Sequence, residues 1–478
     1  MAKLSKKQIE ELKKRLEYKA HTVWEKADAR RRKEIFATAE RYKEFLDQAK
    51  TERLAVEFIR DRARAAGFRP LEGGGRGRKV YAEFQGKAIA LAVLGRSGPE
   101  RGLRLIGTHI DAPRLDLKMH PLYENQDLAF LKTHYYGGIK KYQWFARPLA
   151  IHGVVCTTEG KSVRIDIGEE PGEPVFTVLD LLPHLSRKLQ SDKKLSEAFE
   201  AERMNLLIGG LPLEARGEGE GKDLVKLAVL EQLQRRYGIT EADLISAELE
   251  IVPAGRARDV GLDRALVGAY GQDDRSCAFA ALEAMMGLRD PAVSCLALFV
   301  DKEEIGSEGA TGARSRFLEL FTARLLARAG VEPNYLAVAG ALASSQALSG
   351  DVTAAFDPDY PEVHEKLNAA YLGRGVVLTK YTGHGGKYNA SEAGAEYVAW
   401  LRGVWDAAGV VWQAAGMGRI DEGGGGTIAK FLAVYGMEIV DAGPPLLSMH
   451  SPFEISHKAD IYSTVQAFRA FFQAPPRA

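Results

Sequence analysis

The chain has 478 residues, and its 65 basic side chains nearly balance 64 acidic ones, so the formal net charge is +1. Hydrophobic residues make up 46% and charged residues 27%, a balance that excludes global disorder and fits two or three folded domains. The near-neutral charge also argues against a dedicated nucleic-acid binder, because such proteins usually carry a strong basic excess.

The N-terminal part is expected to begin with helices and to continue with strands. Apolar residues recur at helical spacing through residues 4–66, and Gly67 is a plausible stop. From about residue 79 the apolar residues no longer recur at helical spacing, and strands are expected at 80–84, 88–94 and 103–107.

The middle of the chain, residues 112–262, has a different pattern of apolar and polar residues. Strands are expected at 151–155, 162–166 and 247–252, and a helix is expected at 224–237. From residue 263 onward strands and helices alternate regularly. The expected strands are 265–269, 295–300, 352–356, 376–379, 410–413 and 438–440, and the expected helices are 276–288, 313–329, 391–407, 427–435 and 459–472. Such alternation predicts an α/β fold with a mostly parallel or mixed sheet covered on both faces.

Cysteine usage and the N-terminus favour a cytoplasmic protein. Cys156, Cys277 and Cys295 are odd in number and widely spaced, which is typical of reduced thiols. The N-terminus has no apolar signal core, and no apolar run approaches the ~20 residues that a membrane span needs. We therefore expect no membrane partner.

Polar side chains that directly follow apolar runs are the candidate site, because open α/β sheets bind ligands at the carboxyl ends of their strands. These residues are His109, Asp111, Asp273, Asp274, Glu303, Glu304 and Asp351, with His450 in a late loop. Taken alone, each of these residues also has a purely structural explanation. A polar turn explains His109 and Asp111, helix capping explains Asp273 and Asp274, and loop positions explain Asp351 and His450.

The Glu303–Glu304 pair favours a functional reading, since two carboxylates past a buried strand are costly unless cations satisfy them. Together the set supplies two imidazoles and several carboxylates, the donors that two divalent ions ~3.5–4 Å apart require. Zinc suits this donor set, and so do cobalt and manganese. One glutamate is left over as a general base, and the Asp111 carboxylate is suited to orienting the ring of His109.

Four motifs carry a resemblance to a known family. They are His109-Ile-Asp-Ala-Pro-Arg-Leu115, Asp273-Asp274-Arg275, Asp301-Lys-Glu-Glu-Ile-Gly-Ser-Glu308 and Ser448-Met-His-Ser451. In this order, over nearly the whole chain, they resemble the zinc aminopeptidase family that includes aspartyl aminopeptidase and vacuolar aminopeptidase I, with this chain as a bacterial-type member. The resemblance implies a discontinuous catalytic domain, residues 1–111 and 263–478, and an inserted β-rich dimerisation and assembly domain, residues 112–262.

The resemblance also implies roles for the individual residues. His109 and Asp351 would hold one metal ion, Glu304 and His450 the other, and Asp273 would bridge both. Glu303 would be the general base and Asp111 the residue that orients His109. The Asp273–Asp274 peptide bond is expected to be cis.

Substrate-binding roles are implied for His184, Lys380 and Tyr388, with His184 reaching the active site of a neighbouring subunit in a homo-oligomer, a dodecamer in the family. The chain departs from the aspartyl-specific pattern at Ala354 and in the segment 357–360, which reads Asp-Pro-Asp-Tyr. These departures leave the preferred N-terminal residue open.

The expected function is therefore a metal-dependent aminopeptidase that hydrolyses peptides with a free N-terminus. The ligand set alone also fits a two-metal deacylase of small N-acyl amino acids. A non-catalytic assembly protein is the remaining alternative, although all expected metal and base positions are filled.

Overall fold

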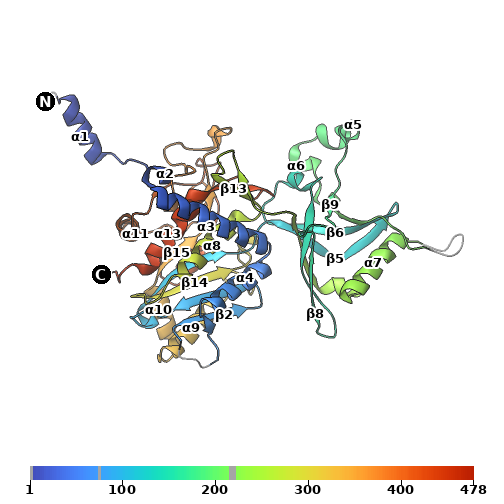
Figure 1. Ribbon diagram of the computed structural model, residues 1–478, viewed down its shortest axis with the longest axis horizontal. Helices are drawn as coiled ribbons and strands as arrows, with labels where there is room; N and C mark the ends of the chain where they lie inside the picture. The colour runs from blue at the N-terminus through green and yellow to red at the C-terminus, as the bar shows by residue number, and fades with distance from the viewer. Residues whose placement is uncertain (1–3, 74–76, 215–221, 478) are drawn as a thin grey trace.

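The computed structural model describes residues 4–73, 77–214 and 222–477, which form two lobes (Figure 1). The larger lobe contains a sheet covered by helices, and both termini belong to it. The smaller lobe is built from strands β5 to β11 with short helices and α7. No helix in these described ranges is long and apolar enough to cross a membrane.

The larger lobe is organised around a nine-stranded mixed sheet. Its order is β1 (Arg69–Pro70), β2 (Lys79–Phe84), β3 (Ala88–Val93), β14 (Ser294–Val300), β4 (Leu103–His109), β15 (Gln346–Gly350), β19 (Glu438–Gly443), β17 (Val376–Thr379) and β18 (Trp412–Ala414). The central strands β14, β4, β15 and β19 run parallel, whereas β3 and β17 pair antiparallel to them. The expected α/β fold with a mixed sheet is confirmed.

Helices cover both faces of this sheet, and each face has its own apolar core. One face packs against α3 (Ala29–Gln48), α4 (Glu52–Ala65), α8 (Gln272–Met286), α11 (Ala395–Ala407) and α13 (Lys458–Gln473). The other face packs against α9 (Phe317–Arg328), α10 (Tyr335–Ala343) and α12 (Ala429–Ala433). Burial on both faces explains why the central strands read as continuous apolar runs rather than as alternating ones.

The smaller lobe has a separate seven-stranded sheet and a separate core. Its order is β8 (Ser162–Ile167), β7 (Leu149–Cys156), β11 (Ala247–Pro253), β5 (Arg114–Asn125), β6 (Leu128–Tyr136), β10 (Leu206–Gly209) and β9 (Thr177–Val178). All of these strands come from residues 114–253, within the range expected for the inserted domain. The long hairpin β5–β6 is not marked by the sequence pattern, and α7 (Leu224–Tyr237) lies where a helix is expected.

A third sheet of five strands joins the loops of the larger lobe. Its order is β12 (Arg258–Val260), β13 (Leu266–Ala269), β21 (Glu454–His457), β20 (Pro445–Leu447) and β16 (Thr353–Ala354). Residues 258–260 pair here with β13, although they precede the expected domain boundary at 262.

Two local expectations need correction. The strand expected at 352–356 is only the short β16, and the sheet strand is β15, which ends just before Asp351. Its small residues have low strand propensity, which is why the sequence pattern missed the strand. At Gly350 the lack of a side chain is needed, since a Cβ there would lie 2.7 Å from Thr108 Cγ2. The helical region 4–66 is divided into α1 (Lys6–Leu16), α2 (Val23–Lys26), α3 and α4, and the side chains of Asp28 and Thr51 cap the last two helices.

Candidate metal centre

The predicted site residues converge where the central parallel strands end. His109 is the last residue of β4, Asp351 follows β15, and Glu303 and Glu304 follow β14. A cleft of about 1010 Å³ opens at this edge. Its lining includes Asp273, Glu303, Glu304, Asp351 and His450.

Asp273 lies between the two imidazoles. Its Oδ1 is 3.2 Å from Nε2 of His109, and its Oδ2 is 3.1 Å from Nε2 of His450. The same nitrogen of His450 is 3.4 Å from Oε2 of Glu304. One carboxylate oxygen thus faces each imidazole, which is the arrangement that a bridging carboxylate needs.

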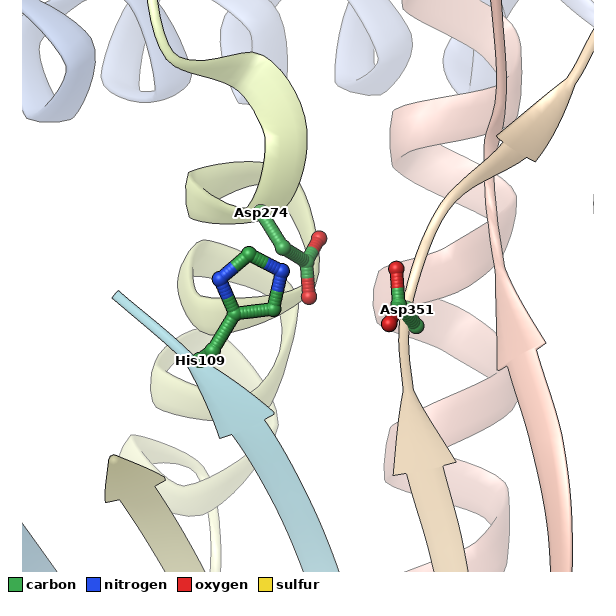
Figure 2. A group of neighbouring side chains, drawn as sticks. All are labelled: His109, Asp274 and Asp351. Atoms are coloured by element: carbon green, nitrogen blue, oxygen red, sulfur yellow. The ribbon is translucent and has the colours of Figure 1, made fainter. Parts of the chain in front are cut away.

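Two groups of possible ligand atoms lie side by side. His109, Asp274 and Asp351 form one group (Figure 2), and Asp273, Glu304 and His450 form the other. Within each group the ligand atoms lie within 4.8 Å of one another. In Figure 2 the carboxylate of Asp274 lies beside the ring of His109, and Asp351 lies on the segment that follows the neighbouring strand.

Asp274 was among the candidate site residues of the sequence, but it was given no role as a metal ligand. The peptide bond between Asp273 and Asp274 is cis, as expected, and both residues have non-helical backbone angles at the start of α8. Oδ1 of Asp274 accepts a hydrogen bond from the backbone N–H of Cys277 at 3.0 Å, which is a capping contact. Its Oδ2 is buried and has no hydrogen-bond partner among the described residues. The available signal was the second acid of the Asp-Asp pair.

Asp111 lies behind His109 and is fully buried. Its Oδ1 is 3.3 Å from Nδ1 of His109 and accepts the backbone N–H of Glu303 at 3.1 Å. Its Oδ2 accepts the N–H of Glu304 at 3.2 Å and the hydroxyl of Tyr136 at 2.8 Å. The backbone carbonyl oxygen of Asp111 also lies 3.2 Å from Nδ1 of His109, so Asp111 fixes the imidazole ring through both groups and the backbone of the Glu-Glu turn through its carboxylate.

Glu454 fixes the backbone on the other side of the centre, and sequence reasoning missed it. Its carboxylate accepts the backbone N–H groups of Gln272 at 2.5 Å, Asp273 at 3.2 Å and His450 at 2.7 Å. These bonds hold the segments that carry Asp273 and His450 next to each other. Glu454 is the first residue of β21, in a segment without a distinctive local motif.

Burial and mutual repulsion perturb the pKa values of the carboxyl groups. Burial, assisted by the charges of Asp111 and Asp273, raises the pKa of Glu303 to about 7. Burial and the charge of Asp273 likewise raise the pKa values of Glu304 and Asp274 well above the ordinary range. Such shifts mark a site where several negative charges share a small, poorly solvated volume.

At the imidazoles, contacts with charged partners outweigh the effect of burial on the pKa. Burial acts to lower the pKa of His450, but its contacts with Asp273 and Glu304 raise that pKa to about 10. Burial also acts to raise the pKa of Asp273, but hydrogen bonds from His109 and His450 hold it below the ordinary value. Positive charge is therefore strongly favoured at the centre of this cluster.

The residues fit bound divalent cations. Oε1 of Glu304 and Oδ2 of Asp274 are buried oxygens without a hydrogen-bond partner among the described residues. Unpartnered buried carboxylate oxygens are costly, and a metal ion satisfies them. Imidazole nitrogens together with carboxylate oxygens are the donor set that zinc takes in catalytic sites.

The predicted substrate-binding residues are not all in this cleft. Lys380 is among the residues that line it. Tyr388 is 73% exposed, and His184 is exposed on α5 (Pro183–Ser186) in the smaller lobe. Among the described residues, neither Tyr388 nor His184 belongs to the lining of the cleft.

Comparisons with known proteins agree with this site. The family described as aminopeptidase I zinc metalloprotease (M18) matches residues 45–472. A probable M18 family aminopeptidase 1 from Clostridium acetobutylicum is 48% identical over 462 residues, which are 95% of this chain and 98% of that protein. A protein with the same description from Thermotoga maritima is 48% identical over 447 residues, 93% of this chain and 97% of that one.

Solved structures extend the agreement to the fold. The crystal structure of an M18 aminopeptidase from Thermotoga maritima has a TM-score of 0.91 at 46% identity and covers 96% of this chain and 100% of that one. A solved dodecamer of mApe1 from S. cerevisiae has a TM-score of 0.71 at 22% identity, covering 91% of this chain and 96% of that one, a likeness of fold alone. The chain therefore belongs to the M18 family of aminopeptidase I zinc metalloproteases and is a metallo-aminopeptidase.

Proposed function

We propose that the chain removes the N-terminal residue of peptides with two divalent metal ions bound at the carboxyl edge of the larger sheet. The proposed ligands are His109 and Asp351 for one ion, Glu304 and His450 for the other, and Asp273 as the bridge between them. The contact of one imidazole with each oxygen of Asp273 carries this proposal. Asp274, beside His109 and Asp351, is a further candidate ligand.

Two bound ions would supply Lewis-acid chemistry, lowering the pKa of a water molecule towards ~7 and stabilising negative charge on the substrate. We propose zinc, and cobalt and manganese also fit the donors. The residues of the chain then fix the geometry: Asp111 holds the ring of His109, and Glu454 holds the backbone of Asp273 and His450.

Glu303 is the proposed general base. Its side chain lines the cleft, and its backbone N–H is anchored on Asp111. It would take a proton from the attacking water and pass it to the leaving amine, and for this it must be ionised. Since its pKa is raised to about 7, activity should rise with pH through that pKa, and nearby cations would move the rise to lower pH.

Substrate recognition is proposed to use the carboxylates for the free α-amine and Lys380 for a polar group of the peptide. Tyr388 is exposed on the loop before α11, so it would have to move inward to stabilise the oxyanion. His184 lies on the smaller lobe, and we propose that it serves the cleft of a neighbouring subunit.

The assembly is proposed to be a homo-oligomer in which residues 112–262 form the inserted assembly domain and residues 1–111 and 263–478 the catalytic domain. Several large apolar side chains in residues 175–195, the segment that contains α5, are exposed, and they support this role because exposed apolar surface can mark an interaction site. They include Val175, Leu179, Leu182, Leu185, Leu189 and Leu195. The solved dodecamer of the yeast protein makes a dodecamer the first arrangement to test.

The test is a hydrolysis profile after reconstitution of metal-free protein with zinc, cobalt or manganese. Aminoacyl substrates with a free amine should be cleaved, with two ions bound per chain by elemental analysis. Cleavage of N-acyl amino acids alone would point to the two-metal deacylase, and a chain that takes up no divalent ion would contradict the proposed mechanism.

A further inference from the structure

A short segment of the smaller lobe reaches the candidate metal centre. It consists of Tyr136, the last residue of β6, and the following Gly137 and Gly138. The rest of the proposed centre comes from the larger lobe, and β6 belongs to the separate seven-stranded sheet. The two lobes therefore meet at the site where the chemistry takes place.

Tyr136 contacts the residue that orients His109. Its hydroxyl donates a 2.8 Å hydrogen bond to Oδ2 of Asp111, whose Oδ1 lies 3.3 Å from Nδ1 of His109. Tyr136 is 8% exposed and Asp111 is fully buried, so water does not replace this bond easily. The hydroxyl thus holds one end of the carboxylate while the imidazole lies at the other.

Arg114 fixes the ring of Tyr136. Its guanidinium carbon lies 3.9 Å from the centroid of that ring, a close cation–π contact. The guanidinium is itself held by Asp116 at 2.8 Å, Glu250 at 3.2 Å and Glu52 at 3.5 Å. The Tyr136 hydroxyl is therefore presented by a rigid, buried group of charges rather than by a mobile loop.

Gly138 performs the equivalent task for His450. Its carbonyl oxygen is 2.8 Å from Nδ1 of His450. Because a carbonyl oxygen only accepts, Nδ1 carries a proton, so the neutral ring that binds a metal ion would offer its lone pair on Nε2, on the side of Asp273 and Glu304. One strand end of the smaller lobe thus acts on both imidazoles, through Asp111 on one and directly on the other.

The absence of side chains on the two glycines allows this close approach. A Cβ on Gly137 would lie 3.3 Å from Cβ of Glu304, and a Cβ on Gly138 would lie 3.2 Å from Nδ1 of His450. Both distances are tighter than ordinary van der Waals contact. Any side chain here would push directly on a proposed ligand.

We propose that the smaller lobe, in addition to any part in assembly, sets the metal affinity of the catalytic lobe. Tyr136 and Gly138 are its positioning residues: Tyr136 orients His109 through Asp111, and Gly138 selects the tautomer of His450. This inference rests on the proposed two-metal function. It adds that residues of the smaller lobe fix the two imidazole ligands in place before the metal ions bind. Partners of this kind around a metal ligand typically contribute about 10- to 100-fold to metal affinity.

The test compares Tyr136→Phe with Tyr270→Phe as a matched control. Tyr270 is also buried, and its hydroxyl donates a 3.0 Å hydrogen bond to the carbonyl of Pro113, with no contact to Asp111 among the described residues. Metal-free protein is titrated with Zn²⁺ or Co²⁺ by calorimetry. Tyr136→Phe should bind the ions about 10- to 100-fold more weakly than wild type, and Tyr270→Phe should bind as wild type does.

A second pair of variants, Gly138→Ala and its control Gly210→Ala, tests the inference if Tyr136→Phe does not fold. Gly138→Ala presses on His450, whereas Gly210→Ala places its Cβ 3.3 Å from a Leu128 methyl group, away from the site. Gly138→Ala should weaken binding of an ion, and Gly210→Ala should not. The inference is overturned if wild type binds two ions and Tyr136→Phe or, where that variant is unfolded, Gly138→Ala binds them equally well. If wild type itself binds no ion, the proposed function fails instead.

Discussion

Two buried histidines of this chain have nearly the same immediate partners. His109, in the larger lobe, lies 3.3 Å from a carboxylate oxygen of Asp111 and 3.2 Å from one of Asp273. His152, on β7 in the smaller lobe, lies 2.8 Å from Asp166 and 3.3 Å from Glu169. Both imidazoles are therefore held between two acids, and both are less than 5% exposed.

The surroundings of the two histidines differ in permanent positive charge. Arg164 forms an ion pair with Asp166, and the buried Lys50 lies 3.3 Å from Glu169. Lys50 also donates hydrogen bonds to the carbonyls of Pro253 and Gly255. The two acids beside His152 therefore already have positively charged partners from the chain itself.

The proposed metal centre lacks such a counterion. Within the described ranges, no lysine or arginine forms an ion pair with Asp273, Asp274, Glu303, Glu304 or Asp351, and two of the carboxylate oxygens are unpartnered. A histidine between two acids therefore indicates a metal site only where the acids have no fixed cation of their own. The difference supports the proposed metal-binding role of His109 and leads us to propose a purely structural role for His152.

The largest expected difference is in metal content. His109→Ala removes a proposed ligand, so this variant should bind fewer than two ions per chain and lose essentially all peptidase activity. His152→Ala should keep both ions, because its partners are already satisfied by Lys50 and Arg164. Elemental analysis of both purified variants checks this. Equal metal loss in the two variants would remove the distinction.

The next largest effect separates chemistry from metal binding within the centre itself. Glu303→Gln keeps the size of the side chain but cannot accept a proton, so kcat should fall by about 10²- to 10⁴-fold while both ions stay bound. Glu283→Gln, on α8 where Glu283 pairs with Arg41 away from the cleft, is the control and should leave kcat unchanged. Retention of full activity by Glu303→Gln would show that another group is the base.

Metal removal should affect stability through only one of the two clusters. At an ion concentration about 100 times Kd, each bound ion stabilises the folded chain by about 2.7 kcal/mol. A chelator should therefore lower the melting temperature of wild type and of His152→Ala by similar amounts. It should change that of His109→Ala much less, and a full shift in His109→Ala would mean that the ions bind elsewhere.

The sequence predicted those site residues that follow buried strands along the chain. His109, Glu303 and Glu304 were found because each lies just past an apolar run, and the carboxyl ends of parallel strands share one edge. His450 follows only the short β20 of the third sheet, which the apolar pattern did not mark, so its Met-His-Ser motif was the signal. The α/β fold was predicted for the same reason, from strands and helices that alternate.

The contacts between the lobes could not be predicted in this way. Tyr136 ends a strand that the apolar pattern did not mark, and Gly138 lies 312 residues before His450 in the chain. Asp274 was named as a candidate but given no ligand role, because helix capping already explained it. Local patterns encode period and capping, whereas the positions of Tyr136 and Gly138 at the centre depend on how two separate sheets meet.

The smallest expected effect is the pH dependence that the His152 cluster contributes to stability. Burial acts to lower the pKa of His152, but hydrogen bonds to Asp166 and Glu169 raise it above the ordinary 6.5. The folded state therefore binds this proton more tightly than the unfolded state. The resulting stabilisation is complete below about pH 6.5 and is lost as the pH rises through the folded pKa, with a slope of at most about 1.4 kcal/mol per pH unit.

The comparison of wild type with His152→Asn isolates this slope. Both proteins are measured with saturating metal, so that His109 and His450 are ligands throughout and do not titrate. The melting temperature of wild type should fall relative to the variant as the pH rises from about 6.5. A second pH dependence is expected at acid pH. Burial acts to raise the pKa of Asp166, but hydrogen bonds from His152 and Arg164 lower it below the ordinary value. The ionised Asp166 therefore stabilises the fold, and this stabilisation is lost as the pH falls through the lowered pKa. Parallel melting curves for the two proteins across both pH ranges would mean that the His152 cluster stores no proton-linked stability, and the contrast with the metal centre would then rest on cation binding alone.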